Sequence, residues 1–198
     1  ASELAARDSG PEYAATSRPA FLSQQGMTPA ERGTALHAFL QFSNYREAAK
    51  DPKAELKRLV GKGFLTEEQG KAVDQRRLRA FLHSSLMSRM LSSQQCFREY
   101  RFTVQIPANE IDPDLPPTLA QEPVVLQGAV DCAFVEEGAL VIVDYKTDRI
   151  HSADELRKRY ARQLELYAQA LTRCTGMPVK ECVLYSFHIN AEVIVSKQ

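Results

Sequence analysis

The stretch GAVDCAFVEEGALVIVDYKTD, residues 128–148, carries charged side chains within a segment that otherwise has the composition of a buried β-hairpin. Glu137 and Gly138 form the natural two-residue turn, because glycine readily adopts the positive φ that such turns need. This turn predicts that Asp131 directly faces Asp144 across the two strands. A four-residue loop gives the same register, whereas a three-residue loop shifts the pair by one position.

Two carboxylates that face each other across a sheet repel, at a cost of roughly 0.2 to 1 kcal/mol, and more where they are partly buried. A divalent cation would neutralise Asp131 and Asp144, since Mg²⁺ is commonly bound by one or two carboxylates plus substrate phosphates. Strand alternation puts Lys146 on the same face as Asp144. Its ammonium could help to deprotonate or orient a water molecule and stabilise charge on a phosphorane-like transition state. A plain salt bridge at a strand end is the alternative, and the residues alone leave both interpretations open.

A glutamine interrupts the apolar face of a helix predicted downstream. At about 100° per residue, Gln163 falls at the centre of one stripe. The apolar members of that stripe are Leu156, Tyr160, Tyr167 and Leu171. A buried amide without partners costs roughly 1 to 3 kcal/mol, so we expect Gln163 to contact the polar edge of the sheet or a nearby backbone carbonyl. His37, in ERGTALHAFL, lies beside the apolar stripe of an earlier helix, and by itself this pattern is typical of a hydrogen-bonded edge histidine.

The remaining sequence predicts helices in the first half and a sheet in the second. Thr28-Pro29-Ala30-Glu31 combines a capping box with proline at the first helical position, and a second capping box begins at Thr66. Alternating side chains after Phe97 indicate a half-buried strand. The expected elements are a helix over 28–42, an interrupted helical pattern over 66–91, a strand over 97–106, an irregular loop over 107–123, the hairpin described above, a helix over 153–173 and a strand pair over 179–189 and 191–196.

This order of elements predicts an α/β fold, a mixed sheet with a crossover helix packed on it and an N-terminal helical subdomain. We expect one domain overall, in which residues 1–27 are an irregular leader, 28–96 the helical part and 97–198 the α/β core. A chain of 198 residues is long enough to bury a substantial core.

Composition excludes several classes of protein. With 25 basic and 25 acidic residues the formal charge is zero, so any nucleic acid must be held by local patches. No apolar run approaches the roughly 18 to 20 residues of a membrane span. The cysteines lack a C-x-x-C pair, which argues against a zinc knuckle, an iron-sulfur site or a disulfide framework; they are Cys96, Cys132, Cys174 and Cys182. We therefore expect a cytoplasmic protein with no membrane association.

Several motifs together resemble the PD-(D/E)xK nuclease superfamily in its RecB-type branch. They are GAVD, a strand ending in VDYKTD, and RQLELY, and upstream ERGTALHAFLQF resembles the histidine-bearing helix of that branch. With RPAFL and GFLTEEQGKAVD the chain looks most like the C-terminal nuclease domains of the AddA subunits of bacterial AddAB helicase-nucleases. The similarity runs from about Arg18 to the C-terminus. It implies a restriction-endonuclease-like fold and a chain that is a fragment of a much longer protein.

The resemblance also implies roles for individual residues. Metal ligation is implied for His37, Asp131, Asp144 and the main-chain carbonyl of Tyr145, and a catalytic role for Lys146. Among the catalytic group the two aspartates count as well. Two further members, Gln163 and Tyr167, match the motif that follows the core and would support the active site or contact DNA.

We therefore predict a deoxyribonuclease, an exonuclease that depends on Mg²⁺ or, in its place, Mn²⁺. It would hydrolyse phosphodiester bonds during double-strand-break processing and recombinational repair. The expected partners are DNA, single-stranded in the main, the helicase portion of the same chain and a partner subunit of the AddB type. Two alternatives have other readouts: a non-catalytic DNA-binding or docking module, and a structural domain that joins other chains, in which Asp144 and Lys146 are merely a salt bridge.

Overall fold

A computed structural model of the chain describes residues 27–197, so all but the last residue of the predicted leader lies outside the described part. Short helices occupy the first half, as predicted, and both predicted capping boxes form, at Thr28 with Glu31 and at Thr66 with Gln69. These helices are α1 (Pro29–Phe42), α2 (Tyr45–Lys50), α3 (Pro52–Gly61), α4 (Glu67–Ala72), α5 (Gln75–Leu82) and α6 (Ser85–Ser92).

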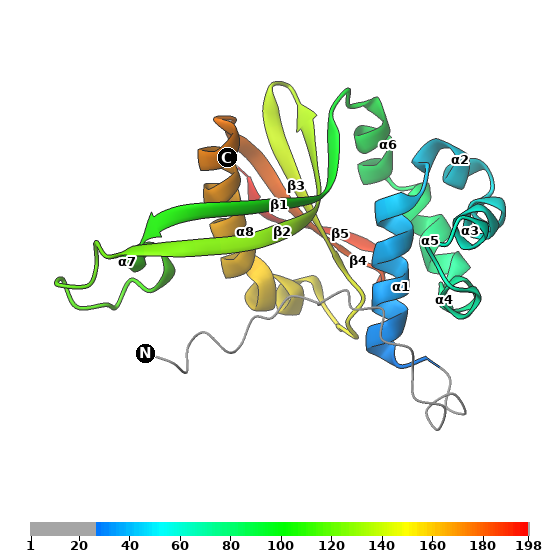
Figure 1. Ribbon diagram of the computed structural model, residues 1–198, viewed down its shortest axis with the longest axis horizontal. Coiled ribbons are helices and arrows are strands. Elements are labelled where there is room, and N and C mark those ends of the chain that lie inside the picture. Colours follow the sequence, from blue (N-terminus) through cyan, green and yellow to red (C-terminus); the bar gives the residue numbers. More distant parts are fainter. Residues whose placement is uncertain (1–26, 198) are drawn as a thin grey trace.

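The second half forms a five-stranded mixed sheet in the order β1-β2-β3-β4-β5 (Figure 1). Its strands are β1 (Cys96–Pro107), β2 (Pro123–Glu136), β3 (Ala139–Lys146), β4 (Val179–Ser186) and β5 (Ala191–Lys197). Strands β3 and β4 are parallel, and the long helix α8 (Ala153–Thr175) crosses over between them, while the other neighbours are antiparallel. The predicted α/β fold with a crossover helix is therefore confirmed.

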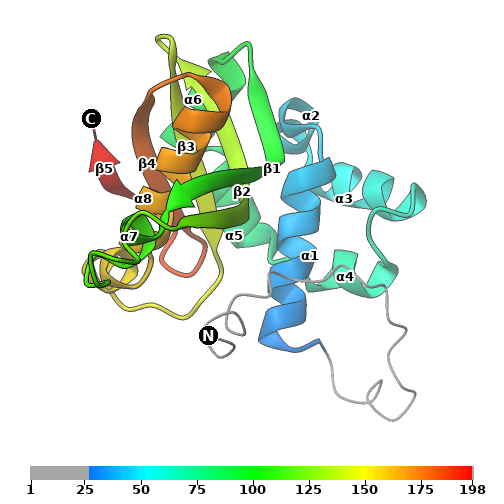
Figure 2. The same cartoon turned by 60° about the vertical axis from the view of Figure 1, so that its left-hand side comes forward.

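The sheet has a separate core on each face. Helices α1–α6 lie on one side and α8 lies on the other, and Figure 2 shows α1 standing between the sheet and helices α3 and α4. In β3, Val141, Val143 and Tyr145 belong to the core beneath α1–α6, whereas Leu140 and Ile142 belong to the core beneath α8. This alternation is the predicted one, and it directs Asp144 and Lys146 toward α8.

The β2–β3 hairpin has the predicted turn and register. Glu137 and Gly138 have φ values of 55° and 80°, and Val135 pairs with Leu140, as that turn requires. Pairing of the two strands ends at Cys132 with Val143.

The first part of β2 continues as a long two-stranded arm with β1 beyond the other strands (Figure 1). The loop between them was expected to hold no regular element, which is wrong, because it contains the single helical turn α7 (Ala108–Ile111). Hydrogen bonds across the loop mouth, from Ala108 N to Glu122 O and from Asn109 N to Ala120 O, close the segment tightly enough for that turn. Among residues 27–197, no helix is long and apolar enough to cross a membrane.

Candidate metal-dependent active site

Asp131 stands where β2 and β3 separate, one position beyond their last pair. Its Oδ2 accepts a hydrogen bond of 2.7 Å from the main-chain N–H of Tyr145, and its Oδ1 lies 3.1 Å from Nδ1 of His37. The prediction that Asp131 and Asp144 form the next directly opposed pair is wrong, because the Asp131 carboxylate itself takes the N–H group that a further rung would use. The carboxylate is thereby fixed at two oxygens.

Asp144 is buried, with 5% of its surface exposed, and its Oδ2 lies 2.8 Å from Nζ of Lys146. Burial raises the pKa of Asp144 to about 6, and the negative charge of Asp131 adds to this effect, while Lys146 opposes it. A carboxylate that is costly to ionise in this way is stabilised by a nearby cation. The expected electrostatic conflict between Asp131 and Asp144 is therefore present, although the two residues are not a strand rung.

Lys146 is held on two sides. Its Nζ pairs with Asp144 and lies 4.0 Å from the centre of the Tyr160 ring, and the Tyr160 hydroxyl donates a short hydrogen bond to Asp148. Burial alone would lower the pKa of Lys146, but the charge of Asp144 outweighs burial and the pKa is raised. Lys146 is therefore an ammonium at neutral pH, suited to donate hydrogen bonds and stabilise negative charge rather than to accept a proton.

His37 reaches this site from α1, on the opposite side of the sheet edge. Ligand atoms of His37, Glu99 and Asp131 all lie within 4.8 Å of one another. Burial lowers the pKa of His37, but the charge of Asp131 and the hydrogen bond to it raise the pKa by more. The local sequence pattern suggested an edge histidine, and the structure gives it a carboxylate partner 94 positions away in the sequence.

Glu99 is the member of this group that the sequence did not single out. It lies in β1 between Arg98, which pairs with Cys132, and Tyr100, which pairs with Val130, so it stands beside Asp131. Burial raises the pKa of Glu99, and the charge of Asp131 raises it further. Its φ of 49° is unusual for a residue other than glycine, and such strain gathers at functional sites.

Two contacts fix α1 so that His37 points at Asp131. The guanidinium of Arg98 donates to the carbonyls of Leu40, Gln41 and Ser43 at the C-terminal end of α1. It also lies 3.7 Å from the centre of the Tyr45 ring.

Near the other end of α1, Gly33 allows close approach to the segment that follows β3. A Cβ at this position would lie 2.9 Å from Oγ1 of Thr147. Helix α1 is therefore held to β1 at one end and against the end of β3 at the other.

Gln163 and Tyr167 are joined by a hydrogen bond of 3.0 Å from Gln163 Nε2 to the Tyr167 hydroxyl. Gln163 is half-buried, so the prediction that it lies at the centre of the buried stripe is wrong; Leu164 and Ala168 take that place. Tyr167 packs edge-on against Phe102 in the arm, with ring centres 5.2 Å apart.

The glycine of the GAVD motif explains how α8 approaches the arm so closely. A Cβ on Gly128 would lie 2.6 Å from Phe102 and 3.1 Å from Tyr167. This part of the motif thus serves the seating of α8, and with it Tyr167, on β1 and β2.

The donor set fits a divalent cation that prefers oxygen ligands. Imidazole nitrogen and carboxylate oxygens from His37, Glu99 and Asp131 converge, and Asp144 adds a buried carboxylate whose charge interacts with those of Asp131 and His37. Such a set suits Mg²⁺ or Mn²⁺ better than a thiolate-preferring metal. The predicted ligand role of the Tyr145 carbonyl stays a prediction, while the Tyr145 N–H holds Asp131 in place.

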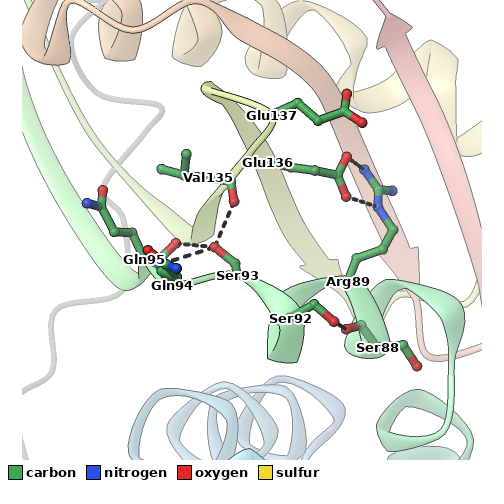
Figure 3. A pocket seen from close by; sticks show the side chains of 9 residues that line it. All are labelled: Ser88, Arg89, Ser92, Ser93, Gln94, Gln95, Val135, Glu136 and Glu137. Carbon is green, nitrogen blue, oxygen red and sulfur yellow. Dashed lines mark hydrogen bonds and ion pairs between the residues drawn. The ribbon is translucent and has the colours of Figure 1, made fainter.

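A hollow at the opposite end of the β2–β3 hairpin has a different character (Figure 3). There Arg89 of α6 binds Glu136 through two hydrogen bonds of 2.8 Å and Glu181 through one of 2.6 Å. Lys180 also binds Glu136, at 2.7 Å. These groups neutralise one another and attach α6 to the sheet, so the hollow has a structural explanation.

Comparison with known proteins agrees with the geometry. The sequence pattern of the PD-(D/E)XK nuclease superfamily matches residues 12–195. The AddA-type component of the ATP-dependent helicase/nuclease of Clostridium botulinum (strain 657 / Type Ba4) is 37% identical over 87% of this chain, and that of Acetivibrio thermocellus is 40% identical over 86%. The chain spans 14% of the length of each of these relatives.

Among solved structures, protein VC1899 from Vibrio cholerae aligns over 87% of this chain and 48% of its own, with 18% identity and a TM-score of 0.31. The match of the superfamily pattern to nearly the whole chain decides the family. This chain belongs to the PD-(D/E)XK nuclease superfamily.

Proposed function

We propose that this chain is a deoxyribonuclease domain that depends on a divalent cation and hydrolyses phosphodiester bonds. The observation that carries the proposal is the convergence of His37, Glu99 and Asp131 beside the buried pair of Asp144 and Lys146. Ligands for a hard cation and a fixed ammonium thus occupy one end of the sheet, which is the combination that phosphodiester hydrolysis requires.

The ligand residues would be His37, Glu99, Asp131 and Asp144, with the main-chain carbonyl of Tyr145. Bound Mg²⁺ or Mn²⁺ supplies polarisation of the scissile phosphate and a lowered pKa of a coordinated water. Asp131 is kept in position by the Tyr145 N–H, and Asp144 would use the oxygen that is not turned toward Lys146.

Lys146 would donate hydrogen bonds to the scissile phosphate or orient the attacking water. Its ammonium is charged at neutral pH, and Asp144 and the Tyr160 ring hold its position, so it needs little reorganisation as negative charge grows. Gln163 and Tyr167 would act through the arm formed by β1 and β2, either by positioning it or by contacting DNA.

The relatives suggest the setting in which this site works. They are helicase/nuclease components several times longer than this chain. We infer an exonuclease portion of a longer ATP-dependent helicase-nuclease that works with a partner of the AddB type in the cytoplasm. Its motor would feed single-stranded DNA to the site from double-strand breaks. A formal charge of zero fits this arrangement, because the motor can supply most of the contacts to the DNA backbone.

The test is cleavage of end-labelled single-stranded DNA by the full-length protein in Mg²⁺, in Mn²⁺ and in EDTA. We expect shortening in either metal and none in EDTA. Asp131→Ala should slow cleavage at least about hundredfold. Asp112→Ala, at an exposed aspartate of the β1–β2 loop, is the matched control and should cleave normally. Metal-dependent DNA retention without any cleavage would instead identify a non-catalytic binding module.

A further inference from the structure

Two thiols face each other beside the candidate active site. Cys96 on β1 and Cys132 on β2 lie on the face of the sheet that packs against α1–α6, with their Sγ atoms 3.6 Å apart. The strand register places Arg98 opposite Cys132, so Cys96 is the diagonal neighbour of Cys132 on that face. Both thiols are free.

We propose that Cys96 and Cys132 are a redox modification site, in which hydrogen peroxide joins them as a reversible disulfide that disables the neighbouring metal site. The effect on cleavage rests on the proposed function. The disulfide itself and its effect on cation binding can be measured without any nuclease activity.

The chemistry takes two steps that balance. The Cys96 thiolate attacks one oxygen of hydrogen peroxide, the O–O bond breaks, and a sulfenic acid and hydroxide form. The Cys132 thiol then attacks the sulfenic sulfur, the S–S bond forms, and the sulfenic oxygen leaves as water after taking up the thiol proton. Two thiols and one peroxide thus give one disulfide and two waters. A dithiol such as reduced dithiothreitol returns both electrons and restores the thiols.

The surroundings assign the two roles. Cys96 is half-exposed at the start of β1, next to Gln95, which lines the hollow of Figure 3, so a small oxidant can reach it. Its pKa is lowered, first by the hydrogen bond from Cys132 and second by the charge of Arg98, which favours the reactive thiolate. Cys132 has no exposed surface, so it meets oxidised Cys96 rather than the oxidant itself.

Closing the disulfide would strain the metal site. An S–S bond measures about 2.05 Å, so the sulfur atoms must approach by about 1.5 Å inside a close-packed core. Cys132 directly follows Asp131, whose two oxygens are engaged by Tyr145 and His37. A shift of β2 at Cys132 therefore moves Asp131 relative to His37 and Tyr145.

The same closure acts on the other ligand-bearing strand. Cys96 lies on the same short piece of β1 as Arg98, which holds α1, and Glu99. Movement on either strand changes the separation of the three ligand groups. Because a reducing compartment reverses such a bond, the modification suits a transient response to peroxide.

The experiment treats the full-length protein with hydrogen peroxide, removes the oxidant, and divides the sample. One part is digested without reductant, and mass spectrometry looks for a peptide that links Cys96 to Cys132. The second part is titrated with Mn²⁺ by calorimetry, and the third is assayed for DNA cleavage. We expect the linked peptide, a loss of Mn²⁺ affinity of at least about tenfold, a matching loss of cleavage, and recovery of all three after dithiothreitol.

Cys96→Ser should bind Mn²⁺ normally and resist peroxide, whereas Cys174→Ser, at an exposed free cysteine, should remain sensitive and is the matched control. Absence of the linked peptide in oxidised wild-type protein overturns the proposal. Unchanged Mn²⁺ affinity after the link has formed also overturns it. If unoxidised protein never cleaves DNA, the proposed function fails, yet the peptide and the Mn²⁺ titration still decide the redox proposal.

Discussion

The main-chain N–H of Tyr145 donates a 2.7 Å hydrogen bond to Oδ2 of Asp131 at the point where β2 and β3 cease to pair. The other oxygen of the same carboxylate meets His37 of α1. One side chain therefore joins two strands and a helix that are far apart in the sequence, and it sets the geometry of the candidate metal site.

Replacement of Asp131 by asparagine should lower the pKa of His37 below its ordinary value of 6.5. The amide oxygen can still accept the Tyr145 N–H, but the negative charge that outweighs the burial of His37 is gone. A histidine NMR titration in EDTA measures this directly. Asp154→Asn, at an exposed aspartate of α8, should leave the His37 titration unchanged. An unaltered His37 pKa in Asp131→Asn would show that the ion pair does not control this histidine.

Glu99→Gln should weaken Mn²⁺ binding by at least about tenfold, because even groups that only support metal ligands have effects of that size. The fold should persist, since glutamine keeps the size of the side chain. Calorimetric titration gives the affinity, and circular dichroism checks the fold. The matched control is Glu67→Gln, at an exposed glutamate of α4. Equal Mn²⁺ affinity for wild type and Glu99→Gln would remove Glu99 from the site.

Asp144→Asn should stabilise the metal-free protein while abolishing stabilisation by metal. The folded-state pKa of Asp144 is raised from 3.8 to about 6, so the unfolded state gives up this proton more readily than the folded state does. Stability is therefore present in full below the ordinary pKa and is lost as pH rises from about 4 to about 6.

At pH 7.5 in EDTA, removing the buried charge should raise the melting temperature by about 5 °C, given about 1.4 kcal/mol per pKa unit. Excess Mg²⁺ should then raise the melting temperature of wild type but not of the variant. Calorimetric melting with and without Mg²⁺ checks both statements. A lower melting temperature for Asp144→Asn in EDTA would contradict the assignment of an unfavourable buried charge.

Arg98→Met should destabilise the protein by roughly 2 kcal/mol, since the carbonyls at the end of α1 lose a charged donor. It should also weaken Mn²⁺ binding, because α1 carries His37. Arg46→Met is matched to it, since Arg46 binds the Leu91 carbonyl at the end of α6, outside the site. That control should lower stability without changing Mn²⁺ affinity. If both variants bind Mn²⁺ equally well, Arg98 has only a structural role.

The sequence predicted those features that depend on short stretches of chain. Capping residues marked the starts of α1 and α4, and alternation with a glycine turn gave the register of the β2–β3 hairpin. The turn also brought Asp131 and Asp144 to the same end of the hairpin. It could not show that the Asp131 carboxylate replaces the next rung, because that depends on which group reaches the Tyr145 N–H.

Glu99 and Arg98 required information that no local pattern contains. The register of β1 against β2 is set across the loop 107–123, whose length and composition do not fix it. Gln163 was placed too deep because the helical stripe was counted around it, whereas the packing of α8 on β1, through Gly128, turns the helix so that Leu164 faces the core. The contact of His37 with Asp131 likewise depends on how α1 packs.

The most direct test of the central claim compares DNA cleavage and Mn²⁺ affinity in Lys146→Ala of the full-length protein. Lys180→Ala serves as the matched control, since Lys180 also pairs with carboxylates but at the far end of the hairpin. We predict that Lys146→Ala loses at least about 100-fold in cleavage rate while it still binds Mn²⁺, and that Lys180→Ala cleaves normally. Cleavage by Lys146→Ala at the wild-type rate would contradict the account.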